Sequence, residues 1–221
     1  MYIEFGNGGS VVRIHSMISW GKIKKILKWV GIGLVGIFVL AVIIRIPHVI
    51  EVEKSKELVA KIHATKLTLK DVWGDNLPPD PGAEADKTIA GIDANKNGIR
   101  DDVELAIFKE YPDSARTRAA LLQYALALQM ETVQPFLNNV IAAGVVDQQD
   151  RAFFCMGDIY PEMEQEGAVL EAILRYGKFL SSHQFNTKER KDAHKYFYSL
   201  IKSGRIENWI NCDIDMKTLT K

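Results

Sequence analysis

The chain has 221 residues, of which 47% are hydrophobic and 25% are charged, and its basic and acidic residues balance at 28 each. This composition excludes an intrinsically disordered chain and is typical of a globular protein with one sizeable core. The charge is uneven, because residues 1–46 hold six basic residues and one acidic residue and leave 22 basic and 27 acidic residues for the remainder. The C-terminal part is therefore acidic and has no basic stripe, so we expect no nucleic-acid partner.

An apolar run follows a cluster of lysines near the N-terminus. Four lysines between residues 22 and 28 precede sixteen uncharged residues, Trp29 to Ile44. As a helix, this run would cover about 24 Å of a bilayer core that is about 30 Å thick. Lys28 and Arg45 can lengthen it by extending their charged ends toward the interfaces. We therefore expect a transmembrane helix over residues 29–46, with the lipid bilayer as its partner.

A cleaved secretory signal is the alternative, because it has the same basic flank and apolar core. Residues 41–47 contain no small-x-small cleavage site and no cysteine for lipid attachment, which favours an uncleaved anchor. A buried core helix fits less well, because three glycines would weaken it in water. By the positive-inside rule, residues 1–28 form a cytoplasmic segment, and residues 47–221 lie in the periplasm, outside the inner (plasma) membrane. Met17 is an alternative first residue, because residues 1–16 show no periodicity.

The chain has two cysteines, Cys155 and Cys212, both in the part that we expect outside the cytoplasm. An oxidising compartment allows a disulfide to persist, and closing a loop of this length would stabilise the fold by roughly 4 kcal/mol. We expect a disulfide between them, and two separate buried thiols are the alternative. Neither cysteine has the spacing or the histidine neighbours of a zinc site.

The part of the chain after residue 46 shows helical periodicity and no alternating β pattern. We therefore expect an all-α fold, a helical bundle of four to six helices. Residues 47–74 predict a juxtamembrane helix, because their apolar residues recur at helical spacing. Residues 75–92 contain three closely spaced prolines and predict an extended linker or strap over the fold. The helical domain is expected over residues 105–221.

Prolines, glycines and capping residues predict where several of these helices begin and end. Pro112 is expected in the first turn of a helix, and Pro135 should kink or divide that helix. Gly144 is expected to end it, and Asn186 or Thr187 should cap the start of the last long helix.

Residues 93–104, DANKNGIRDDVE, place oxygen-bearing side chains at alternate positions and then a glycine. Calcium takes about six to eight oxygen ligands in a flexible shell, and a short peptide can supply them if it turns sharply around the ion. Gly98 stands where that turn is needed and meets no steric penalty there. The candidate metal ligands are the side chains of Asp93, Asn95, Asn97, Asp101 and Glu104 and the backbone carbonyl of Ile99.

This pattern resembles an EF-hand loop, D-x-[DN]-x-[DN]-G-x5-E, and also the shorter calcium repeats of the thrombospondin type-3 kind. The resemblance covers residues 93–104 only, and it implies Ca²⁺ as a cofactor. Arg100 departs from it, because paired EF-hands usually carry an aliphatic residue at this place, and the sequence has no second loop. Only three of the ligands are carboxylates, which predicts weak binding, about 0.1 to 1 mM, and a structural ion rather than a sensor. An Asx-rich turn that caps the next helix without a metal is the alternative.

No motif of a known catalytic centre occurs in the chain, so no catalytic residue is predicted. We expect a non-enzymatic scaffold or interaction module of the cell envelope, with a protein partner of unknown identity. An envelope enzyme, for example a hydrolase, is the main alternative, and an immunity protein that binds a toxin is another. A His-carboxylate pair with shifted pKa values in a pocket would favour the enzyme. An apolar groove would favour a binding module. An exposed apolar patch would favour the immunity protein.

Overall fold

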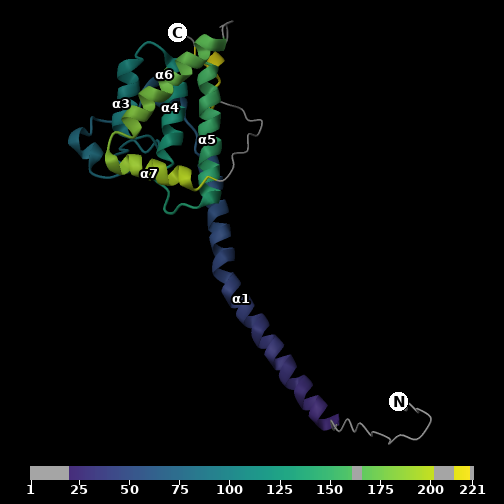
Figure 1. Ribbon diagram of the computed structural model, residues 1–221. Coiled ribbons are helices and arrows are strands. Elements are labelled where there is room, and N and C mark those ends of the chain that lie inside the picture. Colours follow the sequence, from purple (N-terminus) through teal and green to yellow (C-terminus); the bar gives the residue numbers. More distant parts are fainter. Residues whose placement is uncertain (1–19, 161–165, 202–211, 220–221) are drawn as a thin grey trace, which may run out of the picture. The chain divides into compact units, whose positions relative to one another are not determined.

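The computed structural model describes residues 20–160, 166–201 and 212–219 (Figure 1). These residues form α-helices and two short 3-10 helices, and no β-strand occurs among them. The all-α class is confirmed for the described residues, and the six α-helices described after α1 match the upper end of the expected number. In chain order the elements are α1 (Trp20–Ala64), α2 (Leu69–Trp73), η1 (Gly82–Asp86), α3 (Asp101–Glu110), α4 (Ala115–Gln129), α5 (Asn139–Gly157), α6 (Glu166–Gln184), α7 (Lys188–Ser199) and η2 (Met216–Thr218). The expectation about Met17 lies outside the described residues.

The chain divides into two compact units, residues 1–52 and 53–221. The long helix α1, which begins in the first unit and ends in the second, is apolar enough and long enough to cross a membrane. Length and composition alone do not separate a membrane anchor from a signal sequence. The helix continues through Pro47, at the junction where the sequence places the end of the span.

The predicted juxtamembrane helix, residues 47–74, is interrupted in the structure. The helix α1 ends at Ala64, and the separate short helix α2 begins at Leu69. Thr68 stops the helix from being continuous, because its backbone N–H and its hydroxyl donate to the carboxylate of Asp71 at 2.8 and 2.6 Å. Such a capping box starts a new helix rather than extending the previous one.

Helix α4 is at the centre of the second unit. It contacts α2, α3, α5 and α6, and all its residues from Thr117 to Gln129 are buried except Tyr124. A helix that is buried on nearly every side must be the core of the domain, and the other helices cover it. Figure 1 shows α7 running across the direction of α4 and α5.

Two of the predicted helix boundaries around α4 and α5 are wrong, and one is confirmed. Pro112 lies outside a helix, because Ser114 caps α4 by accepting the backbone N–H of Thr117 at 3.3 Å and serine is the stronger start signal. Pro135 lies between α4 and α5 and so divides the run, as predicted. Gly144 does not end a helix but lies inside α5, where an added Cβ would be 3.0 Å from Cγ2 of Val59. The glycine therefore allows close approach of two helices.

The proline-rich strap, residues 75–92, is attached to the last long helix by one arginine. Thr187 caps α7 as predicted, and Arg190 in its first turn is 0% exposed. Its guanidinium donates to the carbonyls of Thr88 and Ile89, each at 3.0 Å, and to the carboxylate of Asp86 at 2.5 Å. A planar group with five N–H donors can satisfy several carbonyls of an irregular segment at once. The strap is therefore held to α7 by hydrogen bonds.

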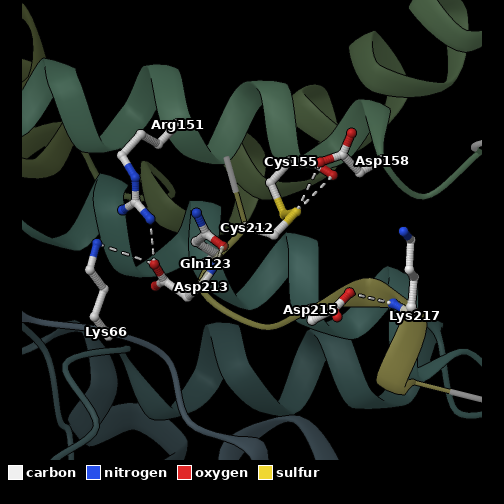
Figure 2. Close-up of a disulfide and its surroundings, with 9 residues drawn as sticks. All are labelled: Lys66, Gln123, Arg151, Cys155, Asp158, Cys212, Asp213, Asp215 and Lys217. Carbon is white, nitrogen blue, oxygen red and sulfur yellow. Dashed lines mark hydrogen bonds and ion pairs between the residues drawn. A yellow bond between two sulfur atoms is a disulfide. The ribbon is translucent and has the colours of Figure 1, made fainter. Parts of the chain in front are cut away.

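Cys155 and Cys212 form the predicted disulfide, which joins α5 to the C-terminal segment, residues 212–219. The carboxylate of Asp213, directly after the bridge, is 2% exposed and lies 3.3 Å from Nζ of Lys66. Arg151 donates to the same carboxylate at 2.7 Å. Figure 2 shows these three charged groups beside the disulfide. The segment is thus held by a covalent bond and by ion pairs to the buried carboxylate of Asp213.

Candidate metal centre

The backbone of residues 93–98 turns around the carboxylate of Asp93. That carboxylate accepts the N–H groups of Asn97 at 3.2 Å and of Gly98 at 3.0 Å. Lys96 and Gly98 have φ angles of 60° and 86°, in the left-handed region. An added Cβ at Gly98 would lie 2.7 Å from Cδ1 of Leu126, so glycine is required here both by its conformation and by the nearby helix α4.

The distal acid of the loop, Glu104, is brought back to the asparagines by the first turn of α3. Asn95 and Asn97 donate their side-chain amides to the two carboxylate oxygens of Glu104, each at 3.0 Å. Glu104 is 1% exposed, and Asn95 also donates to the carbonyl of Asn76 in the strap at 2.9 Å. The two amides and the distal carboxylate therefore converge, although seven to nine residues separate them in the chain.

The remaining predicted ligands, Asp101 and Ile99, fix the loop to the domain. Asp101 is 0% exposed, and its two oxygens accept the N–H of Ala94 at 3.0 and 3.2 Å. The side chain of Ile99 is buried in the core, and its N–H donates to Oδ1 of Asn97 at 2.9 Å. These hydrogen bonds join the two halves of the loop and so fix the course of its backbone.

The loop buries negative charge without a basic side chain to balance it. Burial raises the pKa of Glu104 to about 7, against the opposing effect of its hydrogen bonds from the two asparagines. Burial also raises the pKa of Asp101. Within the part of the chain that the structure describes, no ion pair includes Asp93, Asp101 or Glu104. The ionised forms of Asp101 and Glu104 are therefore disfavoured in the folded loop unless a positive charge lies nearby.

The three acids of the loop do not all share one centre in the structure. No group of three or more His, Cys, Asp or Glu side chains converges on a metal position in the described ranges. Asp101 instead faces the backbone of Ala94, and the amides of Asn95 and Asn97 present N–H groups to Glu104. The oxygen ligands of the loop suit a hard cation. To coordinate such a cation beside Glu104, the side-chain amides of Asn95 and Asn97 would have to rotate so that their oxygens replace the N–H groups that now face this carboxylate.

Arg100, which departs from the EF-hand pattern, attaches the loop to the helical body. It is fully buried and donates to the carbonyls of His183 and Gln184 at 2.6 and 3.0 Å, at the C-terminal end of α6. The positive charge of the Arg100 guanidinium at the C-terminal end of α6 also interacts favourably with the dipole of this helix. Gly91 has a φ of 71°, and an added Cβ there would lie 2.2 Å from Cδ of Arg100. No spacing pattern in the sequence indicated that Arg100 would attach the loop to α6.

A second polar cluster, which the sequence did not predict, joins α7 to the end of α4. His194 Nδ1 lies 2.7 Å from the carboxylate of Glu131, whose other oxygen accepts the amide of Gln149 at 2.6 Å. Tyr198 donates its hydroxyl to Gln149 at 3.1 Å. Burial raises the pKa of Glu131, and the hydrogen bond from His194 opposes this shift. Glu131 and His194 are 63 residues apart, so no short motif could reveal the pair.

A cleft of about 540 Å³ lies at the start of α4, away from this pair. Its described lining contains one carboxylate, Asp113, and no histidine. The complete described lining is Asp113, Ser114, Ala115, Arg116, Thr117, Ile159, Tyr160 and Leu219. The described cleft therefore lacks the paired titratable groups that would mark a hydrolytic centre.

Comparison of the chain with protein families, with curated proteins and with solved structures finds no significant match. The interpretation of the loop therefore rests on its residues, its hydrogen bonds and its burial.

Proposed function

We propose that this chain is a membrane-anchored, extracytoplasmic protein whose helical domain binds one structural Ca²⁺ ion in the loop of residues 93–104. The observation that supports the ion most directly is the burial of Asp101 and Glu104 without a basic partner among the described residues. An ionised carboxylate away from water is unfavourable unless a cation compensates it. Carboxylate, amide and carbonyl oxygens are hard ligands and favour calcium over zinc or copper.

The ion would stabilise the fold by joining the strap to the helical body. The loop contacts the strap through Asn95 and Asn76, α6 through Arg100, and α4 through Gly98 and Leu126. Binding to the folded loop alone adds its free energy to folding. We therefore place the protein among scaffolds or interaction modules of the cell envelope, with a protein partner.

Calcium titration of the full chain in detergent tests the site. We expect one ion per chain, with a dissociation constant of about 0.1 to 1 mM, and much weaker binding in the Glu104→Gln variant. The variant Glu110→Gln makes the same chemical change at an exposed position of the same helix and should bind like the wild type. If the wild type binds no calcium at millimolar concentrations, the loop is a metal-free turn that caps α3.

The anchor and its orientation are supported by the asymmetric lysines and by the disulfide, which persists in an oxidising compartment. Protease added to spheroplasts should digest residues 53–221 from the outside. Intact mass of the membrane-bound protein separates an anchor, which keeps residues 29–46, from a cleaved signal, which loses them. A domain that resists protease until the membrane is lysed would show the opposite orientation.

One observation supports the second candidate, an envelope hydrolase. The Glu131 carboxylate orients the ring of His194, and such a pair can act as a general base. Assays against ester, phosphodiester and peptide substrates should then detect turnover that is lost in His194→Gln, while the melting temperature stays close to that of the wild type. Absence of turnover on every class would leave the pair with a structural role.

A further inference from the structure

The first nine residues of α1, Trp20 to Lys28, lie directly before the apolar run and contain four lysines. All four side chains are exposed, and within the described ranges no ion pair includes any of them. At 3.6 residues per turn they fall within an arc of about 160° on one side of the helix. The four lysines, named the basic face from here on, are Lys22, Lys24, Lys25 and Lys28.

The opposite side of this segment is apolar. Trp20, Ile23, Ile26 and Leu27 fall within the remaining arc, over about 120°. At the boundary between the two sides, Nζ of Lys24 lies 5.9 Å from the ring centroid of Trp20. A helix with lysines on one face and tryptophan and leucine on the other is typical of the membrane interface.

The other end of the apolar run has no such charge. Residues 45–57 contain three basic and three acidic residues and are therefore neutral overall. An electrostatic attraction between α1 and a membrane surface is thus confined to the N-terminal end, because no acidic residue lies between Trp20 and Ile44.

We propose that the basic face binds the headgroups of anionic phospholipids in the leaflet at the N-terminal end of α1. This site rests on the proposed function, because it requires the apolar run to lie in a bilayer. The ligand is a phosphate diester with a net negative charge, such as phosphatidylglycerol. Lysine ammonium groups attract such a group as compact charges, and each lysine close to an anionic surface strengthens association about fivefold. A zwitterionic headgroup carries no net charge to be selected.

Reconstitution of the full chain into vesicles of mixed phosphatidylcholine and phosphatidylglycerol tests the site. Spin-labelled forms of each lipid report their relative association with the protein by electron paramagnetic resonance. Because one headgroup is close to about one lysine at a time, we expect a preference of about fivefold for phosphatidylglycerol in the wild type. It should be lost at about 1 M salt, where the screening length is about 3 Å. The preference should also disappear in the quadruple variant Lys22→Gln, Lys24→Gln, Lys25→Gln, Lys28→Gln.

A control variant with the same change in net charge separates a local site from the charge of the whole protein. Its four positions are exposed and lie beyond the apolar run: Lys54→Gln, Lys56→Gln, Lys61→Gln, Lys70→Gln. This variant should keep the preference.

Extraction of the vesicles with alkaline carbonate separates failure of the lipid site from failure of the anchor. If the wild type remains in the membrane but shows equal association with both lipids, the lipid site is wrong and the anchor stands. The same conclusion about the site holds if the two quadruple variants behave alike. If carbonate extracts the wild type, the anchor is wrong, and the lipid site is wrong with it.

Discussion

Replacement of Glu104 by glutamine should remove the response of the protein to calcium while leaving its metal-free stability nearly unchanged. Glu104 is the acid that the first turn of α3 returns to Asn95 and Asn97. Glutamine has nearly the same shape, but it lacks the negative charge and one of the two acceptor oxygens. In chelator, the loss of an amide hydrogen bond, about 1 kcal/mol, is offset by removing the unfavourable burial of a carboxylate.

The magnitude of the calcium effect follows from mass action. At about 10 mM calcium and a dissociation constant of about 0.1 to 1 mM, binding to the folded state adds about 1.4 to 2.7 kcal/mol. For a chain of this size each kcal/mol shifts the melting temperature by about 2 to 4 °C. Thermal melting of the full chain in detergent should therefore move by about 3 to 10 °C between chelator and calcium.

The comparison needs the wild type, Glu104→Gln and the matched control Glu110→Gln, each melted in chelator, in calcium and in magnesium. We expect the calcium shift in the wild type and in Glu110→Gln, and no shift in Glu104→Gln. Magnesium should be less effective, because it demands a rigid octahedral shell. An unchanged wild-type melt in calcium would refute the structural ion. A full shift in Glu104→Gln would refute the role of this carboxylate.

Three further predictions concern contacts that hold the domain together. Arg190→Lys should lower the free energy of unfolding, measured by urea denaturation, by about 2 kcal/mol or more, because an ammonium cannot replace the planar set of donors. Equal stability of the variant and the wild type would contradict the role of Arg190 in holding the strap. Replacing Cys155 and Cys212 together, by alanine and serine, should lower it by up to roughly 4 kcal/mol, and the wild type under reducing conditions should match the variant. Because burial raises the pKa of Glu131 above its ordinary value of 4.5, the ionised form is disfavoured in the folded state. The free energy of unfolding of the wild type, relative to that of Glu131→Gln, should therefore fall as the pH rises from below 4.5. A difference in this free energy that stays constant between about pH 4 and pH 8 would show that burial does not raise the pKa of Glu131.

Features that depend on residues near one another in the chain could be predicted from the sequence. Thr187 caps α7 as expected, because its hydroxyl accepts a backbone N–H in the first turn of the helix. The expected break at Pro135 also occurs, since a proline cannot donate the hydrogen bond that a continuous helix needs. Local spacing was sufficient in each of these cases.

Predictions failed where a distant part of the chain decided the outcome. Gly144 was expected to end a helix, but its position is set by close packing against Val59, which is far away in the sequence. On α6, two adjacent apolar residues differ in burial: Ile173 is buried, whereas Leu174 is 61% exposed. Periodicity shows which residues share a face, but not which other element covers that face.

The order of residues was enough to indicate an apolar run behind lysines, an all-helical domain, two cysteines able to pair, and alternating oxygens around Gly98. Each of these follows from residue types and from local spacing, without knowledge of which segments pack together. Only the folded chain shows that Arg100 reaches the end of α6, that Asp213 is buried against Arg151, and that Glu131 meets His194. Burial of a polar group is costly unless a partner is brought to it, and in these three cases the partner comes from packing of segments that are remote in the sequence.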